Sequence, residues 1–480
     1  MKKSIIIIAV LLLGVSATAQ KKWTLKECVE YALENNISIK QSELDLKATD
    51  IEALTALGNF LPSLSASAGV NENTGLSFNP VTNNAQTTTF LAASGRVNVG
   101  YTVFNGLRNI RQAQRAKVSN LAGQYRLSKM KDDISLLVAN SYLSVLLNKA
   151  NLEVLKSQNE VTKQQIEQTK QLVEVGTLPE GDLLEITATD AGEQQSIVNA
   201  ENQIKLSLIT LAQILLIKDY ENFDIEDEGY GIVDSISDKT IDEIISNAKE
   251  NRSEIKIAEQ NVELANKDLQ IAKGAYLPTL TAFFGYDTRF SDATSLLSFQ
   301  DTSQGPIGQS PTNLVDSNGG AVLANVFPEV LVETTVDPFI NQLYQNDGIA
   351  YGFSLNIPIF NGFNTRASVK RNKINLERSK FQLEQAELDL ESNVYQAYVD
   401  AKGTLKAYEA AQSALESQEL AYEYAKARYD EGLTNAFDFS QAKLRYDNSK
   451  INLNRTKYDY IFRLKVLELF FGIPATELKF

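Results

Sequence analysis

The chain carries the same sequence pattern twice. Residues 24–64 align without a gap with residues 240–280, and the paired positions differ by 216. From about residue 104 onward the difference is 256, so the second copy holds extra chain between residues 287 and 349. Each copy is far longer than a solenoid repeat of about 20–50 residues, which indicates a duplicated domain with one surface insertion site. The matching pairs include Leu61-Pro62 with Leu277-Pro278, Phe104-Asn105-Gly106 with Phe360-Asn361-Gly362, Gly176 with Gly432, and Asp182 with Asp438.

The duplication sets the expected domain boundaries. Residues 1–19 have the form of a signal peptide, with a basic start and an apolar run too short to span a bilayer. We expect its removal; a retained membrane anchor is the alternative. The first structural repeat covers residues 20–239 and ends in an acidic connector, residues 219–238. The second repeat covers residues 240–480 and ends in a short tail.

Composition excludes several classes of chemistry. The chain has no histidine, which rules out Ser-His and Cys-His catalysis and histidine metal ligands. The sequence contains no phosphate loop, nucleophile elbow or metal cluster, so we predict neither an enzyme nor a bound cofactor. A formal charge of −14 without basic tracts is unsuited to nucleic acid. The single cysteine, Cys28, falls at helical spacing and is expected to be a small apolar core residue.

Proline placement and apolar spacing predict very long helices. Residues 81–178 and 359–473 contain no proline, and from Leu383 to Leu415 apolar residues step by three or four positions. A glycine turn follows each long helix, and a second helix returns from it. The predicted long helices are 107–175 and 363–431, their returning partners are 182–217 and 438–471, and shorter helices cover 24–34, 36–60, 240–250 and 252–276.

Four segments alternate between apolar and polar residues, which predicts β-strands. Each repeat contributes two strands joined by a polar loop, and a strand length of about 9–12 residues suits an outer-membrane barrel. Four strands are too few to close a barrel, so either they form a soluble sheet or several chains pool them. The predicted strands are 63–71, 95–104, 279–287 and 350–360, and the loops between them are 72–94 and 288–348.

The order of helix, strand, loop, strand, long helix, turn and helix, present twice, resembles the TolC-type outer-membrane efflux protein family. These proteins are the exit ducts of tripartite pumps and type I secretion systems. The resemblance covers residues 22–474 and includes the duplication itself. It is carried by the Leu-Pro junctions at Pro62 and Pro278, the Phe-Asn-Gly strand exits at 104–106 and 360–362, and the turns Val175-Gly176-Thr177 and Glu431-Gly432-Leu433.

The resemblance implies a homotrimer in the outer membrane of a Gram-negative bacterium, with a long periplasmic extension. The fold class is then mainly α with a β-barrel contribution: three chains pool twelve strands in one β-barrel, and the duplicated helix hairpins form a periplasmic α-barrel. The resemblance also implies a passive channel-tunnel that exports small molecules or proteins. An inner-membrane transporter of the RND, ABC or MFS type would drive export, with a periplasmic adaptor docked at the turns. Drugs, metals and secreted proteins use similar ducts, so the resemblance assigns no substrate.

An alternative from another class is a structural or adhesive coiled-coil envelope protein whose strands form a soluble β head. Helix hairpins that return to the same end argue against it, because adhesive stalks usually run one way. An exported binding protein is a second alternative, but the sequence shows no ligand-pocket motif for it.

The resemblance further implies roles for single residues. Asp182 and Asp438 match positions that narrow and charge the closed periplasmic entrance, and Glu185 would add a further ring. The alternative is that both aspartates only complement the dipole of the helix that begins beside them. Two family positions differ here, since the place of a gate-locking basic residue is Thr434 and that of a second acid is Gln441.

Charged and aromatic residues gather where strands are expected to meet helices. Basic residues such as Arg108 and Arg366 begin the long helices, and they either contact lipid phosphates or form a solvated helix face. Aromatic residues such as Tyr276 and Phe363 form either an interfacial girdle or packing at the junction. The strand–helix junction residues are Pro62, Phe104, Gly106, Pro278, Phe360 and Gly362.

Overall fold

The computed structural model describes residues 21–79, 84–227, 229, 232, 239–294, 296–315, 317–333 and 335–473. The predicted signal peptide, part of the acidic connector and the end of the tail lie outside the described residues. The described chain divides into two compact units. The helical unit consists of the described residues within Met1–Ala53, Gln114–Leu269 and Lys370–Phe480. The strand-rich unit consists of those within Leu54–Ala113 and Gln270–Val369.

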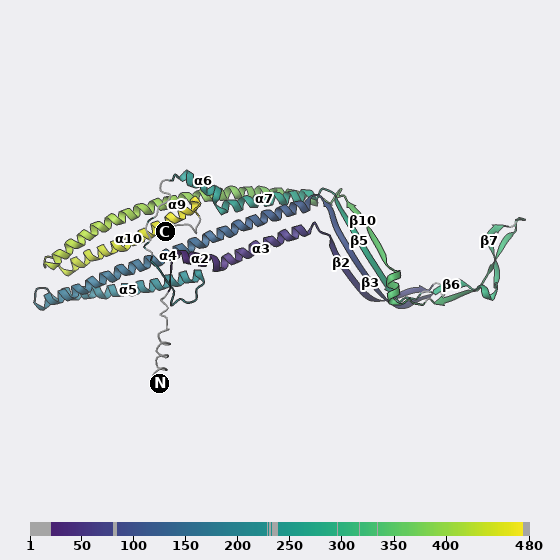
Figure 1. Ribbon diagram of the computed structural model, residues 1–480, viewed down its shortest axis with the longest axis horizontal. Coiled ribbons are helices and arrows are strands. Elements are labelled where there is room, and N and C mark those ends of the chain that lie inside the picture. Colours follow the sequence, from purple (N-terminus) through teal and green to yellow (C-terminus); the bar gives the residue numbers. More distant parts are fainter. Residues whose placement is uncertain are drawn as a thin grey trace, which may run out of the picture. The chain divides into compact units, whose positions relative to one another are not determined.

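The helices follow one plan in both repeats: two shorter helices, a long helix, a turn and a returning helix (Figure 1). Each set begins at a threonine, because Thr24 and Thr240 close capping boxes with Glu27 and Glu243. The bounds of the helices in this plan all lie within two residues of the ranges predicted from the sequence. The first repeat holds α2 (Leu25–Asn35), α3 (Ile37–Gly58), α4 (Arg108–Glu174) and α5 (Glu180–Leu215), and the second holds α6 (Ile241–Asn251), α7 (Ser253–Gly274), α9 (Asn364–Asp430) and α10 (Ala436–Phe471).

The helical unit has a core to which both repeats contribute. Cys28, Tyr142 and Leu211 of the first repeat are buried together with Ile461 of α10. The prediction that Cys28 is a small core residue is confirmed, and burial raises the pKa of its thiol to about 12. A second cluster joins α6, α9 and α10 around Ile244. Among the described helices, none is both long enough and apolar enough to cross a membrane.

Part of the acidic connector packs against the first repeat. Asp224–Ile225 (β4) pairs in parallel with Lys22–Trp23 (β1). The Lys149 ammonium of α4 donates a hydrogen bond to the Asp224 carboxylate over 2.5 Å. The acidic character of this segment therefore includes a specific ion pair, which composition alone does not reveal.

The strand-rich unit is built on a four-stranded antiparallel sheet with the spatial order β10-β5-β3-β2 (Figure 1). β3 and β5, from different repeats, pair in the middle, and β2 and β10 form the two edges. The strands are β2 (Ser63–Asn79), β3 (Asn84–Asn105), β5 (Thr279–Ser291) and β10 (Gly348–Asn356).

The first hairpin is longer than the sequence predicts. Strands expected at 63–71 and 95–104 stay paired from Ser63↔Gly100 out to Asn79↔Asn84. The prediction of a loop over 72–94 is therefore wrong for most of that range. Polar residues on both faces hide the period of two there, but cross-strand pairs hold the ladder, as in the 2.9 Å hydrogen bond between the Thr74 and Thr89 hydroxyls.

The register of the strands gives the sheet one apolar and one polar face. The alternation predicted from the sequence is confirmed, and apolar side chains such as Tyr351 and Leu64 are 79% and 73% exposed. Direct cross-strand partners on the apolar face form the rows Leu64, Val99, Phe284, Tyr351 and Ala66, Val97, Tyr286, Ile349. The polar face carries rows such as Ser65, Asn98, Gly285 and Ser67, Arg96, Asp287.

The inserted segment of the second repeat folds into small elements of its own. β6 (Leu296–Gln300) pairs with β9 (Glu329–Glu333), and β7 (Gly308–Val315) pairs with β8 (Ala321–Val326), which gives two nested hairpins with a short 3-10 turn (Thr302–Gln304). α8 (Phe339–Gln345) packs on β5, where the Phe339 and Phe290 rings meet edge to face with centroids 5.0 Å apart. The range 288–348 is therefore not a plain loop.

Candidate functional site at the helix turns and strand junctions

The turns that follow α4 and α9 have the same backbone geometry. Each helix ends in a glycine with positive φ, +76° at Gly176 and +71° at Gly432. In both turns the residue after the glycine donates its N–H to the carbonyl five residues earlier over 2.8 Å. This Schellman motif favours a residue without Cβ at the left-handed position. The six predicted docking residues are all exposed: Val175, Gly176, Thr177, Glu431, Gly432 and Leu433.

The two aspartates predicted to lie at the entrance, Asp182 and Asp438, are in the first turns of the returning helices but have different surroundings. The Asp438 N–H donates to the side chain of Asn435, the N-cap of α10, over 2.8 Å. The Thr434 hydroxyl donates to the Asp438 carboxylate over 3.3 Å. Asp182 occupies the matching position of α5, but its N-cap is Pro179, which offers no side-chain cap. Both carboxylates lie where the helix dipole favours negative charge, as the helix-start interpretation requires.

An aromatic cluster near the turns joins the two repeats. The rings of Tyr429 in α9 and Phe439 in α10 stack with centroids 5.1 Å apart, and Ile186 of α5 is buried with them. The Tyr429 hydroxyl lies 2.8 Å from the Thr169 hydroxyl of α4, at hydrogen-bond distance. Burial raises the pKa of Tyr429, and the charge of Asp182 adds to the increase. Asp182 therefore lies within electrostatic reach of this cluster.

A buried lysine joins the repeats further along the returning helices. Lys443 of α10 is 4% exposed, and its ammonium donates to the Thr162 hydroxyl of α4 and the Glu193 carboxylate of α5, each over 2.5 Å. Asp447 of α10 lies 3.9 Å from the same ammonium. Burial raises the pKa of Asp447 to about 6, although the charge of Lys443 opposes the shift. Glu185 lines the adjoining cavity of about 430 Å³ together with Glu193 and Asp447.

The strand–helix junction of the first repeat is closed by the second repeat. Gly106 has a φ of +69°, and a Cβ placed on it would overlap the Gly274 carbonyl oxygen and lie 2.9 Å from the Leu277 Cβ. A Cβ on Gly274 would in turn lie 2.6 Å from the Gly106 carbonyl oxygen. The two backbones touch, so both positions need glycine.

The matching junction of the second repeat is open. Gly362 has a φ of +62°, but nothing lies within 4 Å of a Cβ placed on it. Ile359 and Phe360, which lead into this junction, are 94% and 74% exposed. Phe104, at the position of Phe360 in the first repeat, is 38% exposed. The same local sequence is therefore covered in one repeat and uncovered in the other.

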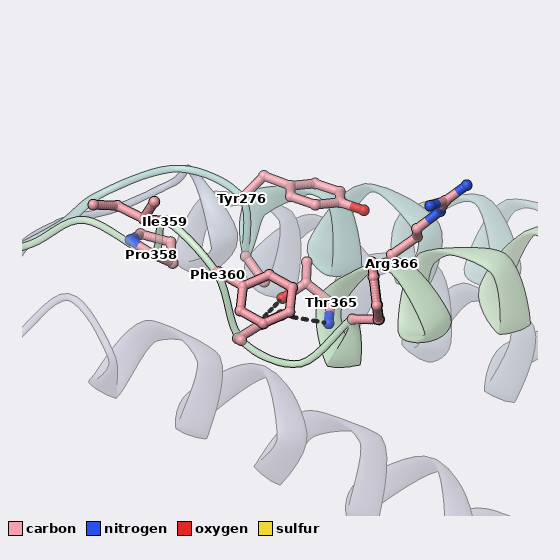
Figure 2. Close-up of a pocket in the computed structure, with 9 residues that line it drawn as sticks. Tyr276, Pro358, Ile359, Phe360, Thr365 and Arg366 are labelled. Carbon is pink, nitrogen blue, oxygen red and sulfur yellow. Dashed lines mark hydrogen bonds between the residues drawn. The ribbon is translucent and has the colours of Figure 1, made fainter.

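A small pocket lies beside the open junction. Figure 2 shows its lining, in which Tyr276 comes from the turn before β5 and Phe360 comes from the segment after β10. The Asn361 side chain donates to the Thr365 hydroxyl at the start of α9 over 2.5 Å. In the first repeat the residue that matches Thr365 is Asn109, whose side chain reaches the Asn59 carbonyl over 2.7 Å. The side chain of Thr365 is shorter than that of Asn109 and makes no equivalent bond to the turn before β5. The pocket at this place has a volume of about 190 Å³.

Pro62 and Pro278 directly precede β2 and β5, where a missing N–H is tolerated at a strand start. Within the described residues, no group of three or more histidine, cysteine, aspartate or glutamate side chains is placed to hold a metal ion.

Lys443 and Tyr429 are not among the site residues predicted from the sequence. A signal exists for Lys443, which lies four residues after Phe439 and three before Tyr446, on the buried stripe of α10. A lysine on such a stripe needs a partner, because lysine is rarely buried unpaired. The partners come from helices of the other repeat, so the sequence flags the residue but not its contacts.

The chain matches the family profile described as outer membrane efflux protein over residues 28–215 and 244–472. Its fold is similar to that of the outer membrane protein VceC from Vibrio cholerae, with 16% identity, a TM-score of 0.71, and 93% of this chain and 96% of that chain covered. It is also similar to the CmeC outer membrane channel of Campylobacter jejuni, with 17% identity, a TM-score of 0.71, and 94% and 85% covered. The open state of the MtrE outer membrane channel of Neisseria gonorrhoeae gives 15% identity, a TM-score of 0.68, and 94% and 89% covered. A search of curated proteins gives no match.

Proposed function

The chain belongs to the outer membrane efflux protein family, and from that membership we propose that it works as a passive duct assembled from three copies. It is an outer-membrane efflux channel. In the proposed mechanism, small molecules or proteins enter from the periplasm, or directly from an inner-membrane transporter, and leave outside the cell. The transporter supplies the energy and selects the substrate, and the channel performs no chemistry.

The four-stranded sheet is the observation that carries this proposal. One face of the sheet is apolar and largely exposed, and β2 and β10 are edge strands of the described sheet. A lipid bilayer does not tolerate open sheet edges, so the strands need partners from other copies. Three copies supply twelve strands, more than the roughly eight that the smallest membrane barrels use. The apolar face then contacts lipid, and the polar face lines the lumen.

The helix hairpins support a periplasmic tunnel. We propose that α4, α5, α9 and α10 of three copies form its wall, and that a periplasmic adaptor docks at the exposed turns 175–177 and 431–433. The transporter partner is of the RND, ABC or MFS type. The left-handed glycines fix the shape of each turn, while the exposed Val175 and Leu433 side chains, 74% and 69% accessible, offer apolar contact.

We propose that Asp182 and Asp438 charge the periplasmic entrance, with Glu185 as a further ring. In a trimer the two aspartates place six carboxylates around one narrow aqueous passage, which attracts cations. Thr434 supports this role for Asp438, because its hydroxyl bond orients the carboxylate at the start of α10. Thr434 stands where the family has a gate-locking basic residue, and its hydroxyl is neutral. Opening of the entrance therefore does not require an ion pair to break at this position.

Conductance in planar lipid bilayers tests the duct. We expect purified protein to produce discrete single-channel steps, with cation selectivity set by the acidic entrance. A folded, detergent-stable trimer that never conducts would contradict the duct. That result would favour a structural or adhesive envelope protein with a soluble β head.

Neighbouring residues of β3 provide a matched pair of variants for this test. Val97 lies on the apolar face and Asn98 on the polar face of the same strand. We expect Val97→Arg to insert poorly into membranes, because an arginine on the lipid-facing side costs about 2–4 kcal/mol of insertion free energy at the bilayer centre. Asn98→Arg should insert normally and lower cation conductance, because its charge faces the lumen. Equal insertion of both variants would indicate that the sheet does not face lipid.

A further inference from the structure

We propose that α8 of the inserted segment is an interfacial anchor, which buries Ile340 and Tyr344 in the acyl chains of the outer leaflet of the membrane. The inference rests on the proposed function, because it requires that the apolar face of the sheet contacts lipid. It goes further by assigning a role to a segment that has no counterpart in the first repeat. The occupant of this exposed helix face is therefore a lipid surface.

Contacts with β5 place α8 on the apolar face of the sheet. Phe290 of β5 lies on the same face as Phe284, because side chains along a strand alternate between the two faces. The Phe290 ring meets the Phe339 ring of α8, with centroids 5.0 Å apart. The Thr288 hydroxyl, on the same face of β5, donates to the Leu343 carbonyl of α8 over 2.6 Å. The apolar face of the sheet, which contacts lipid in the proposed function, therefore continues onto α8.

Side chains at the end of α8 also bond the open edge of β5, which gives an independent indication. β10 pairs with β5 only as far as Asp287, so no described strand covers the last residues of β5 on this side. The Gln342 side chain accepts from the Ser291 N–H over 3.0 Å and donates to the Ser291 carbonyl over 2.9 Å. The Asn346 side chain donates to the Arg289 carbonyl over 3.1 Å. Backbone groups at a strand edge need such partners within the protein where water is scarce, as beside a bilayer.

The length of β5 puts α8 at the outer boundary of the membrane. From Thr279 to Phe290 the strand extends about 36 Å at roughly 3.3 Å per residue. A tilt of about 40° leaves roughly 28 Å along the membrane normal, close to the height of about 25 Å of the apolar band in membrane barrels. The Thr279 end joins the helices of the proposed periplasmic tunnel, so Phe290 and α8 lie at the opposite boundary. An amphipathic helix at this boundary can place one side among acyl chains and the other in water.

The side of α8 that is turned away from β5 has one apolar and one polar stripe. Ile340 and Tyr344, four residues apart, are 59% and 77% exposed. Asn341 and Gln345 form the parallel polar stripe and are also exposed. Residues 290–365 contain no lysine or arginine, so this surface does not fit lipid phosphates. The apolar stripe fits acyl chains, and the tyrosine hydroxyl fits the polar boundary of the bilayer.

The first experiment measures the surroundings of spin labels on single introduced cysteines, in protein reconstituted into phospholipid vesicles. Cys28 is fully buried, so wild type should take up no label and serves as the background. Electron paramagnetic resonance compares collisions with oxygen, which concentrates in lipid, and with a water-soluble nickel chelate. We expect Tyr344→Cys to give an oxygen-to-nickel ratio several-fold above that of Gln345→Cys, its neighbour on the polar stripe. Both side chains are exposed, so neither label should disturb the fold.

Two labels on β10 separate failure of this inference from failure of the proposed function. Tyr351 lies on the apolar face of the sheet and Ser354 on the polar face. If Tyr351→Cys collides mainly with oxygen and Ser354→Cys with nickel, while Tyr344→Cys collides with nickel, the anchor is wrong and the duct stands. If Tyr351→Cys also collides mainly with nickel, the sheet does not face lipid and the proposed function fails. A Tyr344→Cys label that neither reagent reaches would mean that a neighbouring copy covers α8, which also overturns the anchor.

The second experiment uses tryptophan fluorescence and needs no label. Phospholipids brominated on their acyl chains quench a tryptophan that lies among those chains, and wild type, whose only tryptophan is Trp23, gives the background. We expect these lipids to quench the emission added by Tyr344→Trp and to leave that added by Gln345→Trp largely unchanged. Equal quenching of the two variants, or quenching of neither, would overturn the inference.

Discussion

The two returning helices, α5 and α10, begin after turns of the same shape but make different polar contacts. Both turns keep the left-handed glycine and the same backbone hydrogen bond. The Lys443 ammonium of α10 donates to Thr162 and Glu193 of the first repeat, whereas α5 has no lysine at the matching position. Duplication has thus preserved backbone geometry and left polar contacts free to diverge. At matching positions α10 has Asn435, Lys443 and Asp447 where α5 has Pro179, Thr187 and Ala191.

Removal of the buried Lys443 ammonium should produce the largest difference in stability between variants of the two returning helices. Lys443→Met leaves the Glu193 carboxylate in a largely buried place without its cation, which we expect to cost about 3–5 kcal/mol. Thermal unfolding in detergent, followed by circular dichroism, measures the loss. Thr187→Met, at the matching exposed position of α5, should change stability by less than about 0.5 kcal/mol. Equal effects of the two variants would show that α10 holds no special contact.

Asp447 should make the stability of α10 depend on pH, whereas α5 has Ala191 at the matching position. Its folded-state pKa of about 6 exceeds the ordinary value of 3.8, so the unfolded chain releases this proton first as pH rises. The associated stability is present below about pH 4 and is lost as pH rises through about 6. Asp447→Asn removes the loss, and we expect the variant to be more stable than wild type by about 2 kcal/mol at pH 7.5 and similar at pH 4.

Denaturation at the two pH values measures the Asp447 effect. The facing groups Lys443, Glu193 and Lys450 remain in the variant, so a difference between the pH slopes reports on Asp447 itself. An unchanged slope would indicate that Asp447 is ionised in the fold at pH 5.

The N-caps predict a smaller difference between the repeats. Asn435→Ala removes a side-chain acceptor from the first turn of α10, which we expect to cost about 1 kcal/mol. Pro179→Ala alters the matching position of α5, where no side-chain cap exists, and should cost less than about 0.5 kcal/mol. Melting temperatures of the two variants, compared with wild type, test the order. A larger loss for Pro179→Ala would reverse the comparison.

The two aspartates of the proposed entrance should have only a small effect on stability. Asp182→Asn with Asp438→Asn should cost only about 0.3–1 kcal/mol per site, because each loses a favourable helix-dipole interaction. The larger effect should be on function: cation selectivity falls, and block by multivalent cations from the periplasmic side weakens. Reversal potentials under a salt gradient measure the selectivity. Selectivity that survives in the double variant rejects the entrance role and leaves the helix-start interpretation.

Much of the helical architecture is readable from the sequence, because proline-free spans and a spacing near 3.6 residues act locally. The extension of β2 and β3 through Thr74 and Thr89 is not readable, since a hairpin partner rather than an apolar period maintains it. The turn glycines are predicted because the left-handed conformation restricts residue type. The partners of Lys443 are not, because they depend on how helices from different repeats pack.

The Gly106–Gly274 contact forms independently of how much of the protein a cell makes. Because both glycines belong to one polypeptide, their encounter occurs at an effective concentration of roughly millimolar order, whatever the expression level. The contacts between copies in the proposed ring form by mass action, so they depend on the concentration of the protein. A ring of this size built from single repeats would need six chains to meet, and fusion of the repeats leaves only three. Fusion therefore shortens the time during which newly exported chains carry unpaired strand edges, the state in which β-proteins aggregate most readily.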